Sequence, residues 1–187
     1  MPYSLLSKAM RYIVEKHDGS YRDGDFALPY ATHPVEVCNN LRYVGGVTDP
    51  ELLCAALLHD VFEEGGTDPA EIESEFGSRV RALVDELTRT EPTQSQVNAL
   101  TKDEVWLLRS GLLFTDISAM SPDAMAIKLA DRLANFRQAA VTRKGEKLRR
   151  YIRQTKKIVD IIPKSVNPCL WKAINRELSA ISRKSKS

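Results

Sequence analysis

Two histidines and two aspartates of this chain stand in sequence contexts where they could bind a metal ion. His33 follows a Pro-Tyr turn, and Asp131 lies in a later helical segment. His59 and Asp60 are adjacent and end an apolar stretch. Imidazole nitrogens and carboxylate oxygens together form a hard ligand set, which suits Mn²⁺, Fe²⁺ or Mg²⁺ better than structural zinc. These residue types favour hydrolysis, because such an ion activates water and neutralises charge on a phosphate.

The His59-Asp60 pair also has a simpler interpretation, a hydrogen-bonded histidine in the core. Neighbouring side chains on a helix diverge by about 100°, so both can reach one ion only at the edge of the helix. Two leucines precede the pair, however, and Glu63 and Glu64 follow it one turn later. Four polar side chains at the end of a buried stripe are costly unless something compensates their charge, which a bound cation would do.

Asp131 shares a predicted helix face with Lys128 and Asn135, which stand three residues before it and four residues after it. Taken alone, this spacing is also compatible with a surface salt bridge between Lys128 and Asp131. Beside the other ligands we interpret Asp131 as the last carboxylate, with Asn135 one turn away to meet water or substrate. His17 closes the first predicted helix, where it can cap the helix dipole or support the site. We do not count it as a metal ligand.

Helix signals are frequent along the chain and strand signals are nearly absent. Asp49, Asp68 and Ser121 each precede a proline, which places a capping side chain before the first helical position. We therefore predict an all-α helical bundle of about eight or nine helices. Residues 1–181 form one domain, 182–187 form a disordered basic tail, and 18–32 and 90–100 are loops, the first of them functional. The helices are expected near residues 3–17, 33–43, 50–64, 69–76, 78–89, 101–110, 122–140, 146–161 and 168–182.

Composition places the chain among ordinary globular proteins. It has 187 residues, 43% hydrophobic and 28% charged, which suits a single domain with a substantial core. It contains no apolar run of about 18 residues, and its amphipathic first helix does not resemble a secretory signal, so we expect a cytoplasmic protein without a membrane span. Cys38, Cys54 and Cys169 form no CxxC pair and are expected to be free thiols in a reducing compartment.

Charge is distributed unevenly along the chain. The net charge of +2 is too small to argue for a nucleic-acid partner. Acidic side chains dominate between residues 49 and 91, whereas basic ones dominate between 143 and 157. The basic segment could be a solvated helix face or a positive rim that attracts a polyanionic substrate. RNA binding is not supported, because no aromatic residues are interleaved as a stacking platform.

Taken together, residues 8–157 resemble the hydrolase domain of the stringent-response Rel/Spo enzymes, which are HD-domain metal-dependent phosphohydrolases. In length the chain is more similar to their stand-alone relatives, the small alarmone hydrolases. The order and spacing of several motifs carry this resemblance, and together they are far more specific than a lone His-Asp pair. The motifs are His17-Asp-Gly-Ser-Tyr-Arg22, Pro29-Tyr30-x-x-His33-Pro34, Ala-Leu-Leu-His59-Asp60-x-x-Glu63-Glu64 and Lys128-Leu-Ala-Asp131-Arg-Leu-x-Asn135.

The resemblance implies an all-helical fold and a reaction in which pyrophosphate is removed from the 3′ position of (p)ppGpp, leaving GDP or GTP. It implies a purine nucleotide with a 3′-pyrophosphate as the partner; a homo-oligomer stays open. It also implies one Mn²⁺ per chain, an acid pair that handles the attacking water, and side chains that bind the substrate. In this chain the metal ligands would be His33, His59, Asp60 and Asp131; the acids Glu63 and Glu64; and the substrate-binding residues Arg22, Lys128, Asn135 and Tyr151.

The chain departs from the family pattern at its nucleotide-binding loop and at its second acid. Glu64 stands where the family usually has aspartate, and Asp23, followed by Asp25, stands where a basic residue is common. These changes leave the substrate open. The alternatives are the close analogue (p)ppApp, the 2′-phosphate of NADPH or another nucleotide on the same metal site. A non-catalytic regulatory module is the remaining interpretation, which four costly polar groups argue against.

Overall fold

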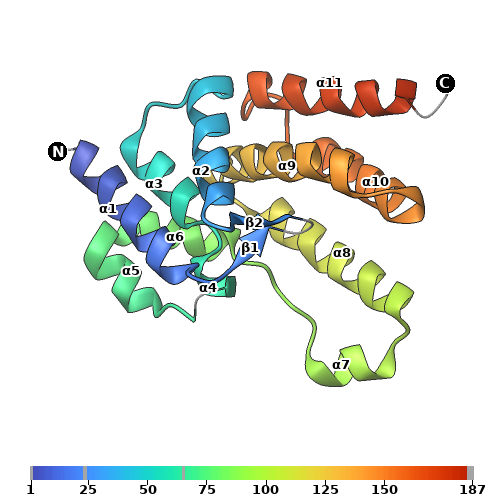
Figure 1. Ribbon diagram of the computed structural model, residues 1–187, viewed down its shortest axis with the longest axis horizontal. Coiled ribbons are helices and arrows are strands. Elements are labelled where there is room, and N and C mark those ends of the chain that lie inside the picture. The colour runs from blue at the N-terminus through green and yellow to red at the C-terminus, as the bar shows by residue number, and fades with distance from the viewer. Residues whose placement is uncertain (1, 23–24, 65, 185–187) are drawn as a thin grey trace.

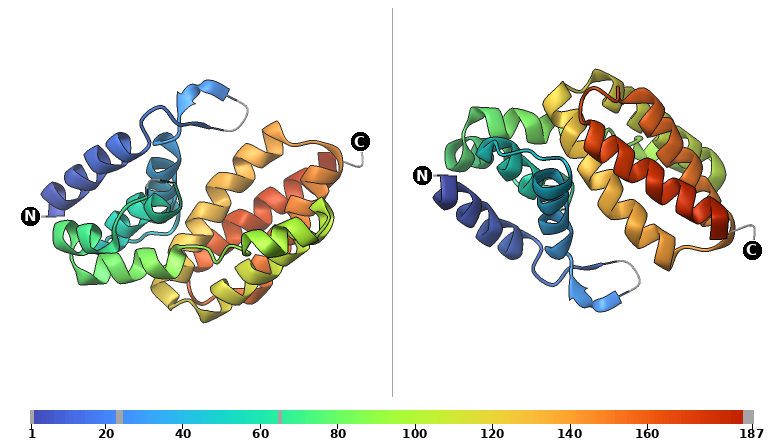
Figure 2. Two further views of the ribbon diagram at one scale, coloured as in Figure 1. Left: turned by 90° about the horizontal axis from the view of Figure 1, so that it is seen from below. Right: turned by 90° about the horizontal axis from the view of Figure 1, so that it is seen from above.

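The computed structural model describes residues 2–22, 25–64 and 66–184, which form a helical bundle with one small hairpin (Figure 1). Figure 2 shows the helices of the N-terminal half on one side of the molecule and those of the C-terminal half on the other. The elements are α1 (Pro2–Lys16), β1 (Tyr21–Arg22), β2 (Asp25–Pro29), α2 (Thr32–Asn39), the π-helix η1 (Asn40–Val44), α3 (Pro50–Leu58), α4 (Val61–Glu64), α5 (Pro69–Phe76), α6 (Ser78–Leu87), α7 (Gln94–Ala99), α8 (Lys102–Ala119), α9 (Pro122–Thr142), α10 (Gly145–Ile161) and α11 (Pro168–Lys184).

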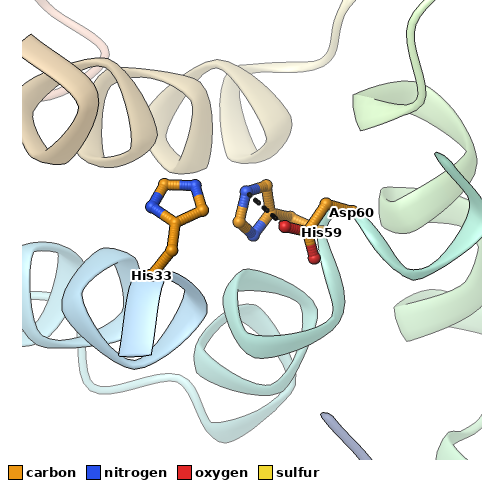
Figure 3. Close-up of side chains that lie close together, drawn as sticks. All are labelled: His33, His59 and Asp60. Atoms are coloured by element: carbon orange, nitrogen blue, oxygen red, sulfur yellow. Dashed lines mark ion pairs between the residues drawn. The ribbon is translucent and has the colours of Figure 1, made fainter. Parts of the chain in front are cut away.

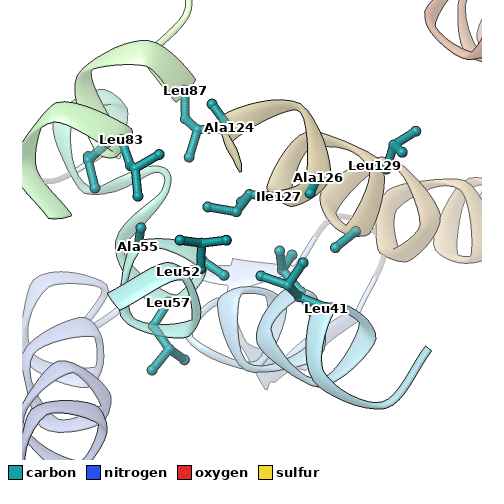
Figure 4. Close-up of a cluster of buried hydrophobic side chains, with 14 of the residues drawn as sticks. Leu41, Leu52, Ala55, Leu57, Leu83, Leu87, Ala124, Ala126, Ile127 and Leu129 are labelled. Atoms are coloured by element: carbon teal, nitrogen blue, oxygen red, sulfur yellow. The ribbon is translucent and has the colours of Figure 1, made fainter. Parts of the chain in front are cut away.

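Helix α9 lies at the centre of the packing. It contacts α2, α3 and α6 on one side and α10 and α11 on the other. Apolar side chains of α3, α6 and α9 meet in the cluster drawn in Figure 4, where Leu52, Leu83 and Ile127 represent the three helices. Because neighbours surround α9, its charged residues Lys128 and Asp131 are buried with its apolar ones. The all-α prediction is confirmed.

The predicted capping residues begin their helices as expected. The Asp49 carboxylate accepts hydrogen bonds from the backbone N–H groups of Glu51 and Leu52 at the start of α3. Asp68 does the same for α5, and the Ser121 hydroxyl accepts from the third residue of α9. Each contact satisfies an N–H group that a helix would otherwise leave unpaired at its first turn.

The helix predicted over residues 50–64 is interrupted at its polar end. Helix α3 ends at Leu58, a turn carries His59 and Asp60, and α4 begins at Val61. The prediction of one continuous helix was wrong because periodicity does not reveal a local break. His59 keeps a helical backbone conformation as the C-cap of α3, so the break lies at the polar end of the helix, where this pair stands.

Three other predicted segments also differ. The loop at 18–32 contains an antiparallel hairpin, in which Tyr21 pairs with Pro29. The loop at 90–100 contains α7, which a capping box of Thr93 and Gln96 begins. A helix expected to end at residue 110 continues as α8 through Gly111 to Ala119, since a glycine in a helix interior costs only about 1 kcal/mol.

The C-terminal tail predicted for residues 182–187 was wrong at its beginning. Helix α11 continues to Lys184, because Ile174 and Leu178 anchor it in the core and it packs along α9 (Figure 1). Residues 185–187 lie outside the described part of the chain. The single domain over residues 1–181 stays a prediction. No helix in the described ranges is both long enough and apolar enough to cross a bilayer.

The cysteines are free thiols, as expected. Cys169 is exposed, whereas Cys54 is buried and Cys38 is partly buried. Burial raises the pKa of Cys38 to about 11 and that of Cys54 to about 12. Both inner thiols therefore stay protonated at neutral pH and pack as small apolar groups rather than as nucleophiles.

Gly45 follows η1, packs against residues at the start of α11 and should not accept a side chain. A Cβ there would lie 2.7 Å from the Leu41 carbonyl oxygen and 3.0 Å from side-chain atoms of Asn167 and Leu170. We expect Gly45→Ala to lower the free energy of unfolding by about 1–3 kcal/mol, measured by denaturant titration. Gly111→Ala is the matched control, because nothing lies within 4 Å of its Cβ. It should raise stability by up to about 1 kcal/mol. Equal effects of the two substitutions would contradict the crowding at Gly45.

Candidate metal centre and substrate cavity

The predicted metal ligands come together from three separate parts of the chain. His33 lies in the first turn of α2, His59 and Asp60 in the turn after α3, and Asp131 in α9. His33, His59 and Asp60 each offer a ligand atom, and these atoms lie within 4.8 Å of one another (Figure 3). Asp131 completes the group, since its Oδ1 is 3.3 Å from His33 Nε2 and 3.9 Å from His59 Nε2. All four residues are at least nine-tenths buried.

The two imidazoles are prepared for coordination. His59 Nδ1 lies 2.9 Å from the Ala56 carbonyl oxygen. A carbonyl can only accept, so Nδ1 carries the proton and Nε2 directs its lone pair toward the cluster. Burial lowers the pKa of His33, an effect that its contact with Asp131 only partly offsets. Neutral imidazole is the form that binds a metal ion, so both rings suit this role.

Hydrogen bonding around the cluster is incomplete without a further group. Neither carboxylate oxygen of Asp60 has a hydrogen-bond partner in the described structure, and His33 Nδ1 also lacks one. Buried polar atoms in this state are costly, and a buried unpaired carboxylate is especially so. A divalent cation between the imidazoles and carboxylates would compensate them, and the mixed nitrogen and oxygen donors fit such an ion. His17 Nε2 lies 3.3 Å from Asp60 Oδ1, so His17 contacts a ligand of the site from behind.

Asp131 is held in place by its own helix. Lys128 Nζ lies 3.1 Å from Asp131 Oδ2, and Asn135 Nδ2 donates a hydrogen bond to Asp131 Oδ1. Burial alone would raise the pKa of the Asp131 carboxyl, but the Lys128 ammonium together with His33 and His59 outweighs this effect and holds that pKa well below its usual range. The salt bridge anticipated from the sequence therefore exists. It is buried beside the histidines rather than on the surface.

Glu63 has a partner that the sequence analysis missed. Its Oε1 accepts hydrogen bonds from the backbone N–H and the Nε of Arg89, both at 3.0 Å, and its Oε2 accepts from Nε at 2.9 Å. Arg89 follows the end of α6 and is one of three arginines in the acidic stretch between residues 49 and 91, but nothing in the sequence indicates which acid it meets. The side chain of Glu64, the second predicted acid, lies outside the described residues.

A cavity of about 450 Å³ opens beside the metal ligands, and all four predicted substrate-binding residues line it: Arg22, Lys128, Asn135 and Tyr151. This volume lies within the range of small-molecule and cofactor sites. Helix α8 forms a wall with Trp106, Arg109 and Ser110, which the sequence analysis did not include because nothing near them resembles a motif. The predicted Asp23 lies outside the described residues, as does the side chain of Asp25.

Most basic side chains of the segment 143–157 do not line the cavity, so they do not form the positive rim that the sequence analysis considered. Of its basic side chains in the described structure, Arg143 alone lines the cavity. Arg149 and Arg153 instead form ion pairs with Glu146 on the exposed face of α10. The solvated-face interpretation therefore describes most of this segment, and the rim interpretation describes Arg143.

The helical fold and this buried histidine-aspartate cluster are those of an HD domain. The chain matches the HD-domain family over residues 9–159 and belongs to it. It is 37% identical over 134 residues to the guanosine-3′,5′-bis(diphosphate) 3′-pyrophosphohydrolase MESH1 of Xenopus tropicalis, covering 72% of this chain and 69% of that one. It is 36% identical over 132 residues to the human protein of the same name, covering 71% and 68%.

A solved structure gives the same result. The chain is similar, with a TM-score of 0.81 and 29% identity over 95% of each chain, to a metazoan ortholog of SpoT that hydrolyzes ppGpp and plays a role in starvation responses. The family resemblance inferred from the sequence motifs is confirmed.

Removing one imidazole should remove the ion. We expect wild-type protein incubated with Mn²⁺ and freed of excess metal to retain a stoichiometric ion, and His59→Ala to retain none, by elemental analysis. His17→Gln is the control, since His17 touches Asp60 but is not one of the candidate ligands. The affinity of this variant for Mn²⁺ should fall about 10–100-fold, but excess Mn²⁺ should still fill the site. Protons compete for imidazole, so binding should weaken at acidic pH. The lowered pKa of His33 places that loss below the ordinary histidine value of about 6.5. Full metal content in His59→Ala would contradict the site.

Proposed function

We propose that this chain is a Mn²⁺-dependent hydrolase that removes pyrophosphate from the 3′ position of (p)ppGpp, with (p)ppApp as the alternative substrate. The observation that carries the proposal is the buried group of His33, His59 and Asp60, which opens on a nucleotide-sized cavity. In this group His33 Nδ1 and both carboxylate oxygens of Asp60 lack hydrogen-bond partners among the described residues. The activity stated in the names of the similar proteins supports the same reaction. A purely regulatory module would have no use for these uncompensated polar groups.

The donor set supports one Mn²⁺ per chain, held by His33, His59, Asp60 and Asp131. Four protein ligands leave room for water and one phosphate oxygen in an octahedral arrangement. A bound divalent ion would supply Lewis acidity, acidifying water and neutralising charge on the phosphorus centre. Lys128 and Asn135 fix the orientation of the Asp131 carboxylate through the contacts described above.

Arg22 is the residue that we assign to the substrate phosphates. Its side chain is 6% exposed and lines the cavity, and the one carboxylate in ion-pair range among the described residues, Glu36, is 4.0 Å away. A guanidinium so weakly paired can form bidentate hydrogen bonds with a phosphate group. Lys128 lines the same wall and adds a second positive charge for the leaving pyrophosphate.

Glu63 is the residue that we assign to the water. In the reaction, the oxygen of water bonds to the phosphorus atom that carries the 3′ oxygen. The bond between this phosphorus and the 3′ oxygen breaks, and a proton passes to the departing 3′ oxygen. Glu63 lines the cavity one turn beyond His59 and can accept the proton of the water. Arg89 holds the Glu63 carboxylate in one orientation through the hydrogen bonds described above. We assign Glu64, the second acid after His59 and Asp60 in the sequence, a supporting role.

The test of this function is product analysis with purified protein, Mn²⁺ and a panel of ppGpp, ppApp, NADPH and GTP. We expect pyrophosphate and the matching nucleoside diphosphate from ppGpp or ppApp, because the cavity brings cationic side chains and the metal ligands together. Omitting the metal should abolish product. Orthophosphate from NADPH would replace the proposal with a phosphatase activity, and a metal-loaded protein inactive on all four would overturn it.

Removing the charge of Glu63 should separate metal binding from turnover. Glu63→Gln keeps the shape of the side chain but cannot take a proton, so we expect kcat to fall by about 10²–10⁴-fold while the metal content is unchanged. Glu146→Gln is the control, since Glu146 lies on α10 outside the cavity. Steady-state kinetics and elemental analysis measure the two effects. Unimpaired turnover in Glu63→Gln would refute the role of this acid.

A further inference from the structure

Two arginines meet at one aromatic ring in the wall of the cavity. The guanidinium carbon of Arg132 lies 4.8 Å from the centroid of the Tyr151 ring, and that of Arg143 lies 4.5 Å from it. Arg132 comes from α9, Arg143 follows α9 directly, and Tyr151 lies in α10. Cation–π contacts of this kind hold a guanidinium in one orientation while leaving its N–H groups free to donate.

These two arginines differ from the other arginines of the cavity in their charge balance. Arg89 is neutralised by Glu63, and Arg109 by Glu91. Neither Arg132 nor Arg143 has a carboxylate within ion-pair distance in the described part of the chain. Two positive charges thus meet at one ring without an anion between them.

Burial makes this imbalance costly at Arg132. The residue is 6% exposed and lines the cavity. Its Nη1 donates to Gln154 Oε1 at 3.2 Å, but its Nε has no hydrogen-bond partner. A buried guanidinium without an anion is disfavoured unless something compensates its charge. Burial also raises the pKa of Tyr151, so the phenol is neutral at physiological pH and does not supply the missing charge.

The arginine pair and the metal ligands lie at different parts of the same cavity. Asp131 and Arg132 are neighbours on α9, so their side chains diverge by about 100°. Asp131 meets the histidines of α2 and of the turn after α3, whereas Arg132 meets Gln154 and Tyr151 of α10. One molecule in the cavity can therefore reach both places with two different groups.

We propose that Arg132, Arg143 and Tyr151 form a second anion subsite, which binds the 5′-phosphate group of a nucleotide whose 3′-pyrophosphate lies at the metal ligands. This inference rests on the proposed function and deepens it, because it names the residues that recognise the 5′-phosphate end of the substrate. Phosphate oxygens satisfy the fork of donors on each guanidinium, and their charge compensates the buried Arg132. Nucleosides with a free 5′-hydroxyl lack the group that this subsite binds.

The test compares Arg143→Gln with Lys144→Gln. Arg143 is exposed at its outer edge and follows the end of α9, so its substitution does not disturb the core. Lys144 is the neighbouring cation and does not line the cavity, which makes it the matched control. With Mn²⁺-loaded protein, the binding of GDP and of guanosine is measured by titration calorimetry. The hydrolysis of ppGpp is compared with that of guanosine 3′-diphosphate, which has no 5′-phosphate.

Wild type and Lys144→Gln should both bind GDP more tightly than guanosine, and Arg143→Gln should lose about tenfold in GDP affinity with guanosine unchanged. In hydrolysis, Arg143→Gln should raise KM for ppGpp by about the same factor and leave guanosine 3′-diphosphate unaffected. Equal affinity of the wild type for GDP and guanosine overturns the subsite, as do equal losses in both variants. If ppGpp is not hydrolysed while the GDP difference persists, the proposed function fails and the subsite stands. If ppGpp is hydrolysed but the 5′-phosphate improves neither binding nor KM, the proposed function stands and the subsite fails.

Discussion

The burial of α9 on nearly every side is the constraint on which the site depends. A helix in this position cannot expose its polar residues to water, so Lys128, Asp131 and Arg132 must find partners inside the protein. Lys128 and Asp131 pair with each other, and Asp131 also faces the two histidines. The desolvation cost of these charges is tolerable only because the groups meet at the wall of a cavity, where a cation and a polyanion can complete the compensation.

The turn that separates α3 from α4 meets this constraint from the opposite side. His59 keeps a helical backbone conformation at the end of α3, and its contact with the Ala56 carbonyl sets the tautomer. His59 and Asp60 each offer an atom to the same group of candidate ligands. An adjacent pair of polar residues at the end of an apolar helix thus supplies two candidate ligands of one site.

Opposite charges are distributed along the cavity in a way that suits an elongated anion. Near the metal ligands, the carboxylates of Asp131 and Glu63 are paired with Lys128 and Arg89. Around Tyr151, by contrast, guanidinium groups have no carboxylate partners within the described residues. The region of the candidate metal ligands fits a cation, because Asp60 has no hydrogen-bond partner there in the described part of the structure. The region around Tyr151 fits an anion. A nucleotide with phosphates at both ends, together with a divalent ion, would satisfy both requirements.

The structure brings His33, His59 and Asp131 to one cavity, as the motifs predict, but the sequence did not reveal what surrounds them. The motifs around His33, His59 and Asp131 are local, so their residue types and spacing carry the chemistry, and each of these residues does reach the same cavity. Arg89, by contrast, is 26 positions from Glu63, and a single arginine in an acidic stretch gives no sign of which acid it will meet. The wall contributed by α8 was missed for the same reason. The short helix α7 was missed although its capping box is local, because its residues are polar and none of them is buried.

The sequence by itself determined which groups could bind an ion, where capping residues begin the helices, and that the fold is helical. These properties depend on residue type and on neighbours within a few positions along the chain. Only the tertiary structure decided that the Lys128–Asp131 pair is buried, that Glu63 is held by Arg89, and that Arg132 and Arg143 share one ring without an acid. The contact between Glu63 and Arg89 joins distant segments, and the strength of the Lys128–Asp131 pair depends on its burial. The partners of these side chains and their burial follow from how the helices pack around α9 and cannot be obtained from local sequence.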